Sequence, residues 1–570
     1  MQRSARTAGT VLVTGLLLSL VACGLAPSSR PDADQPPRVR ETLITPAPPE
    51  VTEAPQPRPN VLVIETDDMR SDDLRWMPNV RRLLQRRGLT FENSFAPYPL
   101  CCPSRASFLT GRYAHNHDVY SHVDPYGFGA FKDRRTLATV LQRAGYTTAL
   151  VGKYLNGYGN QPVHRTGESS LDYVPPGWSQ WYAGSDRAWL PWETYGGGTY
   201  DYFSLTQNIN GRLESFPGRY STGVLAEQTR QLVRDFGRGS KPWFVWWTPV
   251  APHHGSPNEA DDPGSTVRTD GYTTHWNTPA RPEWVKGQFD EQITHGSGTP
   301  HEESAEEDVS DKPRYLRRMP ELTDAERAAL TTVTRQRAES LFVLDVHIGR
   351  TISTLSRTGQ LPNTVILLTS DNGYYLGEHR KRQGKINLHE PSLRVPLIIA
   401  GPGVPRGHRY DPVTTVDLAP TIAAYAGTRM RRPDGIDLRP VITGGDRGWD
   451  RPVVTEGMMP EVGYAAGTRL GPSVLNTRGL RLGRWKLTRY STGESELYDL
   501  HTDPLELNNL ARRPAHATTL RQMKRLWRRY ADCRGAECVA TVPAKYRVTA
   551  RASRVITERQ KEITRRYYGG

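Results

Sequence analysis

The sequence contains no apolar run long enough to cross a bilayer, no dense basic segment and no internal repeat. A membrane-spanning helix needs roughly 20 apolar residues, so we predict no such helix. The formal net charge is +14, but the arginines that produce it are scattered along the chain. A nucleic-acid-binding protein concentrates such charge into a patch or a motif. We therefore attribute the charge to composition and predict no nucleic-acid partner.

Cysteine is scarce, with five in 570 residues. Cys533 and Cys538 lie in the segment CRGAEC, close enough for a small-loop disulfide outside the cytosol; two free thiols are the alternative. Cys101 and Cys102 are adjacent, and adjacent cysteines rarely bond each other because the ring would strain the peptide between them. This pair is therefore not expected to have a structural role.

The overall composition is ordinary for a soluble globular protein, with 36% hydrophobic and 24% charged residues. A chain of 570 residues can form one large domain and a smaller one. We expect an α/β fold with the large domain over residues 59–443 and a smaller α+β subdomain over residues 444–570.

The N-terminal segment has the composition of an export signal. Arg3 and Arg6 precede the apolar stretch VLVTGLLLSLVA, which is followed by Cys23, so residues 1–22 are predicted to be a signal peptide. The junction LVAC resembles the lipobox of bacterial lipoproteins, which implies lipidation of Cys23; an ordinary signal peptide with an incidental cysteine is the alternative. Residues 23–58 are rich in proline and polar residues and predict a semi-extended tether. We expect an exported, lipid-anchored protein on the cell-surface or periplasmic side of the membrane.

Four short apolar runs each end in polar or charged residues. Their length and composition predict buried strands of a largely parallel sheet, separated by helical patterns. The runs are residues 60–68, 147–154, 242–254 and 363–373. Helices are predicted over residues 77–88, 136–145 and 323–359, the last opened by a capping box. Because open α/β sheets bind ligands at the carboxyl ends of strands, we expect the residues that end the four runs to form one site.

The polar residues at two of these ends are typical of a metal site. Asp67, Asp68, Asp371 and Asn372 offer hard oxygen ligands and no soft ones. Such a set suits Ca²⁺, with Mg²⁺ as the second choice. Asp67 and Asp68 alone are equally well explained as a loop or helix cap, and it is the second pair that favours a metal.

The segment LCCPSRASFLTGR, residues 100–112, matches the pattern Cys-x-Pro-Ser-Arg-x-x-x-Leu-Thr-Gly-Arg at every fixed position. This pattern is the signature of the type I sulfatases, which the chain resembles over residues 60–511. The resemblance implies that a separate formylglycine-generating enzyme oxidises Cys101 to Cα-formylglycine, while Cys102 occupies a free position. The doublet CCPSR followed by GRYAHNH is most similar to the N-acetylglucosamine-6-sulfatase branch.

The resemblance also implies roles for the strand ends and for one later lysine. The implied metal ligands are Asp67, Asp68, Cys101, Asp371 and Asn372. The implied catalytic residues besides Cys101 are Arg105, Lys153, His253 and Lys385. The fold implied is that of the alkaline-phosphatase superfamily, a large mixed sheet between helix layers.

One position departs from the arylsulfatase pattern. Many arylsulfatases read Gly-Lys-Trp-His, whereas this chain reads Gly-Lys-Tyr-Leu-Asn, which places Leu155 where the histidine would be. The N-acetylglucosamine-6-sulfatase branch shares the sequence Lys-Tyr-Leu-Asn. Asn156, His115 or His117 could replace the missing histidine, although a loop histidine is more often structural.

The chemistry explains why these residue types are needed. In the family the hydrated aldehyde offers one hydroxyl for attack on sulfur and a second to expel sulfate, which splits one hard step into two. The metal polarises the sulfate oxygens. Arg105 lies one helical turn after Cys101 and is expected to face the same site. Lys153 and Lys385 are expected to hold sulfate oxygens, and His253 to protonate the leaving oxygen.

The sequence therefore predicts a sulfatase acting on a sulfated sugar such as N-acetylglucosamine 6-sulfate. One alternative is a phosphoesterase or phosphonate monoester hydrolase of the same superfamily. The other is a lipoprotein that binds sulfated glycans without turnover, which requires Cys101 to remain a thiol. Residues 255–320 are polar and irregular and are expected to form a loop-rich insertion beside His253 that bears on substrate choice.

Overall fold

The computed structural model describes residues 58–123, 125–186, 197–300, 306–457 and 477–569. The predicted signal peptide, Cys23 and all but the last residue of the predicted tether lie outside these ranges. Within them, no helix is both long and apolar enough to span a membrane.

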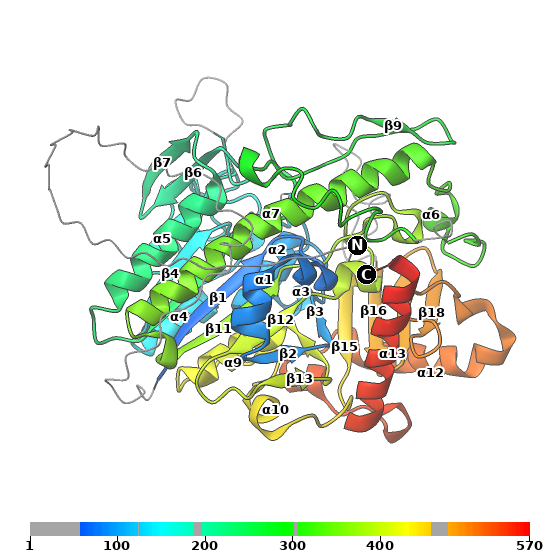
Figure 1. Cartoon of the computed structure of the whole chain (residues 1–570). Coiled ribbons are helices and arrows are strands. Elements are labelled where there is room, and N and C mark those ends of the chain that lie inside the picture. The colour runs from blue at the N-terminus through cyan, green and yellow to red at the C-terminus, as the bar shows by residue number, and fades with distance from the viewer. Residues whose placement is uncertain (1–57, 124, 187–196, 301–305, 458–476, 570) are drawn as a thin grey trace, which may run out of the picture.

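A ten-stranded sheet runs through the large domain (Figure 1). The strand order is β13-β2-β12-β11-β1-β8-β4-β5-β6-β7. Its strands are β1 (Asn60–Thr66), β2 (Leu89–Phe91), β4 (Thr147–Gly152), β5 (Gln180–Gly184), β6 (Ser204–Ile209), β7 (Arg212–Pro217), β8 (Trp243–Thr248), β11 (Thr364–Ser370), β12 (Leu397–Ala400) and β13 (Gly407–Arg409).

The predicted strands form the centre of this sheet, where β11, β1, β8, β4 and β5 are parallel. Antiparallel pairs follow on both sides, between β11 and β12 and between β5 and β6. The central strands read as continuous apolar runs because both faces of the sheet are covered. The prediction of a large mixed sheet is confirmed.

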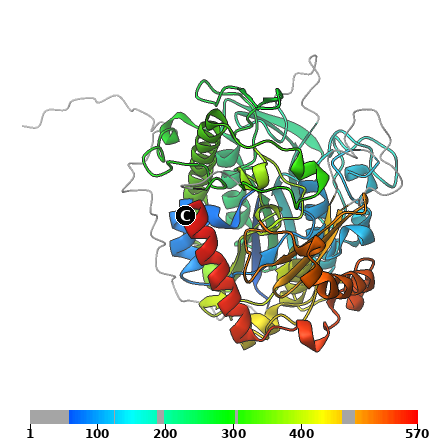
Figure 2. The same cartoon turned by 90° about the vertical axis from the view of Figure 1, so that its right-hand side faces the viewer.

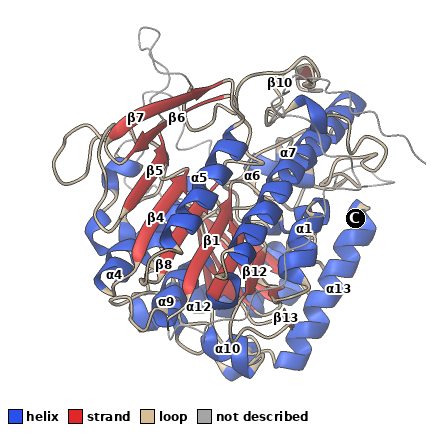
Figure 3. Cartoon of the chain, turned by 60° about the vertical axis from the view of Figure 1, so that its left-hand side comes forward, coloured by secondary structure: helices blue, strands red, loops and turns tan. Residues whose placement is uncertain are grey.

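Helices cover the two faces (Figure 3), and each face has its own core. Alternate side chains of a strand point to opposite faces, so Val61 and Val63 of β1 join one cluster while Leu62 and Ile64 join the other. The first cluster is shared with α2 (Cys101–Thr110), α4 (Leu137–Arg143) and α9 (Leu418–Tyr425). The second is shared with α1 (Pro78–Val80), the π-helical η3 (Arg81–Gln85), α5 (Ser221–Phe236) and α7 (Asp324–Arg357).

The longest helix, α7, crosses the sheet as the sequence predicts (Figure 1). Thr323 caps its first turn by accepting from the amide of Glu326, and the Glu326 side chain returns a bond to the amide of Thr323. The shorter elements are β3 (Ser94–Phe95), α3 (Ala114–His117), η8 (Glu378–Arg380), α8 (Glu390–Leu393), β14 (Val413–Thr414) and α10 (Arg439–Gly444).

The C-terminal subdomain contains an antiparallel sheet of β15 (Val453–Gly457), β16 (Thr477–Leu482), β17 (Trp485–Tyr490) and β18 (Ser495–Asp499). Helix α12 (Ala517–Tyr530) packs on this sheet. The segment LRLGRWKLTRY, which reads as one alternating strand, is a hairpin that turns at Gly483 (φ 57°). The terminal helix α13 (Ala550–Tyr568) returns to the large domain, since Thr557 contacts Asn93 (Figures 1 and 2).

The insertion after His253 is loop-rich, as predicted. Its described part holds two-residue strands β9 (Thr266–Val267) and β10 (Thr273–Thr274), a short turn of 3-10 helix and α6 (Arg314–Arg317). It is anchored by Arg281, whose guanidinium bonds to Glu259 at 2.7 Å and to Glu339 of α7 at 2.8 Å. The loops are therefore tied to the main helix layer.

Candidate active site

The sheet order brings four of the predicted strand ends to one edge. Strands β11, β1, β8 and β4 are consecutive neighbours, and they deliver Asp371, Asp67, His253 and Lys153 in that order. Backbone bonds continue the ladder into these residues: the amide of Asp371 donates to Thr66 at 3.1 Å and that of Lys153 to Thr248 at 2.9 Å. The hydrogen-bond ladder of the sheet thus fixes the backbone from which the side chains of Asp371 and Lys153 extend.

Gly152 is what allows Lys153 to leave β4 at this point. Its φ of 119° lies where residues with a side chain are strained. A Cβ there would lie 2.3 Å from the carbonyl oxygen of Thr248 on β8. The Gly-Lys pair therefore combines close strand contact with a buried ammonium group.

Cys101 is the first residue of α2, and its thiol lies among the strand ends. The Sγ atom donates to Oδ1 of Asp67 at 3.2 Å, and Nζ of Lys385 lies 2.6 Å from the same sulfur. Cys102 points away, with its Sγ 3.6 Å from the carbonyl oxygen of Asn156, inside the core. Two adjacent cysteines thus have separate environments, one polar and one apolar.

The side chains of Arg105 and Lys153 also contact the carboxylates around Cys101. Nε of Arg105 donates to Asp371 at 2.8 Å, and its Nη1 donates to the carbonyl oxygen of Lys153 at 3.1 Å. Nζ of Lys153 donates to Oδ2 of Asp67 at 2.5 Å. Lys385, from the loop after η8, forms an ion pair with Asp68. The three ammonium and guanidinium groups therefore face three carboxylates in a cluster that is buried apart from Lys385, whose side chain is 10% exposed.

The oxygen atoms of this cluster fit a divalent metal ion. Oδ2 of Asp68 and Oδ1 of Asn372 are buried and have no hydrogen-bond partner. Ligand atoms of Asp67, Asp68, Cys101 and His253 lie within 4.8 Å of one another. Unpaired buried oxygens are costly unless a cation or donor satisfies them. The donor set is hard and oxygen-rich, which suits Ca²⁺ or Mg²⁺.

Burial and the neighbouring charges shift the pKa values of Asp67, Asp68 and Cys101. Burial would raise the pKa of Asp68, but the attraction of Lys385 outweighs it and lowers that pKa to about 2. Burial likewise opposes ionisation of Asp67, yet the attraction of Lys153, with Arg105 and Lys385, holds its pKa well below the usual value. Burial, together with Asp371, raises the pKa of the Cys101 thiol well above its ordinary value. An unmodified Cys101 is therefore a protonated, weak nucleophile at neutral pH.

His253 follows β8 and faces the carboxylate of Asp68. Its Nε2 lies 3.6 Å from Oδ2 of Asp68, and its Nδ1 bonds to the carbonyl oxygen of His254 at 2.6 Å. A carbonyl only accepts, so Nδ1 carries the proton and Nε2 of the neutral ring is an acceptor. Burial lowers the pKa of His253 to about 3. The ring must gain a proton in the substrate complex before it can act as an acid.

The candidates for the missing histidine lie elsewhere. Both ring nitrogens of His115 are engaged, with Glu456 and with the carbonyl oxygen of Cys533, each at 2.7 Å. His117 bonds to Ser107 at 3.0 Å and accepts from the amide of Val119. These histidines support the fold and do not join the cluster.

Asn156 and Leu155 also have settled positions. Asn156 donates to the hydroxyl of Tyr200 at 2.5 Å, and the ring of Tyr200 lies 4.9 Å from Nζ of Lys153. Asn156 therefore contacts the site only through Tyr200. Leu155, at the position of the arylsulfatase histidine, is part of the core.

Sequence reasoning missed three residues that contact or neighbour the cluster. The ring of Tyr200 packs at a tilt against that of His253, with 4.6 Å between the ring centroids. Arg337 of α7 donates to the carbonyl oxygen of Asp68 at 2.6 Å, where the backbone has a positive φ of 66°. His122 has a buried, unpartnered Nε2, and burial with the charges of Lys385 and Lys153 lowers its pKa well below the usual value. None of the three lies in a motif, and only the fold reveals them.

Comparison with known proteins agrees with this architecture. Residues 59–428 match the family model described as Sulfatase, and residues 377–532 match that of N-sulphoglucosamine sulphohydrolase, C-terminal. The chain belongs to the sulfatase family, whose members are sulfuric ester hydrolases. The two matches overlap over residues 377–428, which include β12 and β13 of the large sheet.

Individual relatives are named for different sulfatase activities. An arylsulfatase of Volvox carteri is 31% identical over 517 residues, covering 84% of this chain and 76% of the relative. The human N-acetylglucosamine-6-sulfatase is 30% identical over 403 residues, covering 68% and 65%. A choline-sulfatase of Rhizobium meliloti is 30% identical over 480 residues, covering 80% and 83%. The predicted family is thus confirmed, and the predicted branch is among the relatives.

Solved structures share the fold. A protein in complex with its substrate D-glucosamine-2-N,6-O-disulfate has a TM-score of 0.59 and 22% identity, covering 83% of this chain and 97% of that one. The phosphonate monoester hydrolase of Silicibacter pomeroyi has a TM-score of 0.58 and 22% identity, covering 87% and 100%. At this identity the likeness concerns the fold alone.

Proposed function

We propose that this chain hydrolyses the sulfate ester of a sulfated sugar, such as N-acetylglucosamine 6-sulfate, with formylglycine at position 101 and a bound divalent metal ion. The observation that carries the proposal is the position of the Cys101 sulfur, between the carboxylates of Asp67 and Asp68 and the ammonium group of Lys385. A group at this position can contact a metal and a sulfate anion together. Ca²⁺ is the first choice of metal and Mg²⁺ the second.

The proposed roles follow from the charges that face the reaction centre. The metal, held by Asp67, Asp68, Asp371 and Asn372, supplies polarisation of the sulfate oxygens. Lys153 and Lys385 bind sulfate oxygens as point charges in a dry site, where such interactions are strong. Their pairing with the carboxylates keeps both lysines charged, because burial alone would lower their pKa but the attraction of those acids raises it.

Formylglycine supplies the nucleophile and the means of releasing sulfate, which an unmodified cysteine does not. Arg105, four residues further along α2, directs its guanidinium at Asp371 and fixes the carboxylates beneath position 101. His253 is the proposed general acid for the departing alcohol. Its ring becomes protonated, and so able to act as an acid, when the bound sulfate anion favours protonation of Nε2.

We also propose export and lipid anchoring at Cys23, with maturation by a formylglycine-generating enzyme. Support for export comes from the Cys533–Cys538 disulfide, with its S–S distance of 2.06 Å, since disulfides persist outside the cytosol. Extracellular sulfatases of Caenorhabditis elegans and Drosophila melanogaster are relatives at 29% identity.

The test is mass spectrometry of the tryptic peptide that contains Cys101, from protein made in its natural host. Conversion of the thiol to the aldehyde lowers the mass by about 18 Da, and hydration restores that amount. Turnover of glucosamine 6-sulfate, an aryl sulfate and an aryl phosphonate is measured on the same sample. Formylglycine with preference for the sugar sulfate supports the proposal. Unmodified cysteine in folded protein, or preference for the phosphonate, would favour the glycan-binding or phosphonate-hydrolase alternative.

A further inference from the structure

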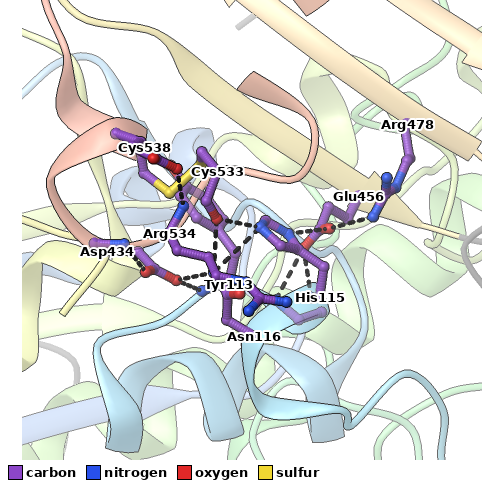
Figure 4. Close-up of a disulfide and its surroundings, with 12 residues drawn as sticks. Tyr113, His115, Asn116, Asp434, Glu456, Arg478, Cys533, Arg534 and Cys538 are labelled. Atoms are coloured by element: carbon purple, nitrogen blue, oxygen red, sulfur yellow. Dashed lines mark hydrogen bonds and ion pairs between the residues drawn. A yellow bond between two sulfur atoms is a disulfide. The ribbon is translucent and has the colours of Figure 1, made fainter. Parts of the chain in front are cut away.

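A second concave site lies at the end of α2 that is remote from Cys101. Its volume is about 930 Å³, which is within the range of ligand-binding pockets. It is lined by the residues after α2, by the loop around Asp434 and by the turn closed by the Cys533–Cys538 disulfide. Figure 4 shows how Asn116, Asp434 and Arg534 converge there.

Arginine dominates the lining of this pocket. The arginines are Arg112, Arg135, Arg431, Arg432 and Arg534. Within the described residues none of them forms an ion pair with a carboxylate; Arg112 bonds only to the carbonyl oxygen of Arg431, at 3.2 Å. Elsewhere buried arginines are paired, as Arg451 is with Asp417 at 2.7 Å. All but Arg112 of the five are exposed, so their charges are available to a ligand.

The two acids of the pocket do not neutralise these arginines. Asp118 pairs with Lys132 at 2.6 Å. Asp434 accepts from the amides of Tyr113 and Gly535, at 2.9 and 2.7 Å. Its remaining partner is the Asn116 amide at 2.8 Å, so Asp434 orders the loops instead of balancing guanidinium charge. The pocket is therefore positive and attracts anions.

The wall that carries Arg534 is rigid. The disulfide joins Cys533 to Cys538, five positions later, and Arg534 lies in the loop that it closes. His115 bonds to the carbonyl oxygen of Cys533 and to Glu456 of β15, each at 2.7 Å (Figure 4). Rigid placement of a guanidinium lowers the entropic cost of binding an anion.

The pocket and the reaction centre lie at the two ends of α2. Arg112 is separated from Cys101 by the ten-residue helix α2, which corresponds to about 15 Å. A second connection runs from Asp118 at the rim to His122, four residues later and so at most about 14 Å away. The charges of Lys385 and Lys153 in turn act on His122, whose pKa they help to lower.

We propose that this arginine pocket binds a second sulfate or carboxylate group of the glycan whose ester is hydrolysed at position 101. The inference rests on the proposed function and narrows it: the substrate is a polyanionic oligosaccharide and not a single sugar. Guanidinium groups suit this task because they bind planar carboxylates and sulfate oxygens with two parallel hydrogen bonds.

The test compares a heparin-derived hexasaccharide with 4-nitrophenyl sulfate as substrates of the full-length, mature protein. The double variant Arg431→Ala/Arg432→Ala is expected to lower the ratio of kcat/KM on the hexasaccharide to that on the aryl sulfate about tenfold, through KM, since two exposed charge contacts are worth about 1.4 kcal/mol together. Arg86→Ala/Arg87→Ala removes the same charge from an adjacent exposed pair outside the pocket and serves as the matched control.

Direct binding separates the ligand classes. Calorimetry with the Cys101→Ala variant, which has no thiol or hydroxyl at position 101 to be oxidised to the aldehyde, measures hexasaccharide affinity without turnover. The affinity is expected to fall about tenfold when Arg431 and Arg432 are also replaced. The proposal is overturned if replacing Arg431 and Arg432 changes neither the kcat/KM ratio nor the hexasaccharide affinity. It is also overturned if a DNA oligomer of matched charge binds as tightly as the hexasaccharide. Absence of turnover of both the hexasaccharide and the aryl sulfate by the mature wild type would instead contradict the proposed function.

Discussion

The ammonium group of Lys385 lies 2.6 Å from Sγ of Cys101 while it also pairs with Asp68. The two residues are 284 positions apart in the sequence. This contact joins the loop after η8 to the first turn of α2, and it places a fixed positive charge beside the atom that maturation would modify. The predictions below follow from this site and from the fold around it.

Replacing Lys385 with alanine should lower kcat/KM for sulfate esters by about 10²- to 10³-fold, because a charge that faces the transition state is lost from a dry site. Formylglycine content must be measured in the same sample, since Lys385 touches Cys101. Lys241→Ala, on an exposed lysine, is the control. Normal conversion with unchanged kinetics would contradict the assigned role.

Replacing His253 with alanine should distinguish leaving groups. If His253 protonates the departing oxygen, the sugar sulfate needs it far more than an aryl sulfate whose phenolate leaves unaided. We expect kcat on the sugar sulfate to fall about 10²-fold or more, with a smaller loss on 4-nitrophenyl sulfate. Equal losses on both substrates would indicate metal or sulfate positioning instead.

Removing divalent metal with a chelator should lower both activity and the thermal midpoint. Binding to the folded state alone stabilises by about 2.7 kcal/mol at a ligand concentration of 100 times Kd. Ca²⁺ should restore the midpoint, and Asn372→Ala, which removes a buried unpartnered oxygen, should weaken that response. A midpoint insensitive to chelator and to added Ca²⁺ or Mg²⁺ would argue against a metal at this cluster.

Gly152→Ala should destabilise the fold by at least about 2 kcal/mol, because its Cβ would meet the Thr248 carbonyl at 2.3 Å in a positive-φ conformation. Gly403→Ala is the matched control, since Gly403 has a φ of 74° with open space around its Cβ position. Denaturant unfolding measures both. Equal losses would mean that backbone strain alone, without the strand contact, sets the cost.

His117 should make stability depend on pH. Burial lowers its pKa to about 3 in the folded protein, whereas the unfolded value is about 6.5. Its contribution to the unfolding free energy is present in full above pH 6.5. It is lost as the pH falls toward 3, because the unfolded state binds a proton that the folded state does not, and the loss at pH 5 is about 2 kcal/mol. His117→Gln should flatten the change in unfolding free energy between pH 7.5 and 5. His275→Gln, at an exposed position, should leave that change as in the wild type.

The sequence predicted those parts of the site that lie in local patterns. Asp67, Lys153, His253 and Asp371 follow apolar strands, and the parallel arrangement of those strands forces their ends together. The CCPSR segment identifies Cys101 without reference to any other part of the chain. The hairpin at Gly483 reads as one alternating strand in the sequence, because a two-residue turn barely interrupts the alternation of its two strands.

The other residues around the site could not be predicted from local patterns, because their positions depend on contacts between distant segments of the chain. Arg337, Tyr200 and His122 enter the site from a helix and two loops whose own sequences carry no metal-binding or catalytic pattern. The same holds for the arginine pocket, whose five guanidinium groups come from four separate stretches of chain.

The sequence by itself determined the strands, the long capped helix and the residue types of the reaction centre, because each is set by neighbours within a few positions. Only the tertiary structure decided which charges meet. It paired Lys385 with Asp68, turned Cys102 into the core, engaged His115 at the subdomain junction and left the pocket arginines without carboxylates. Such pairings depend on long-range packing, which no local pattern encodes.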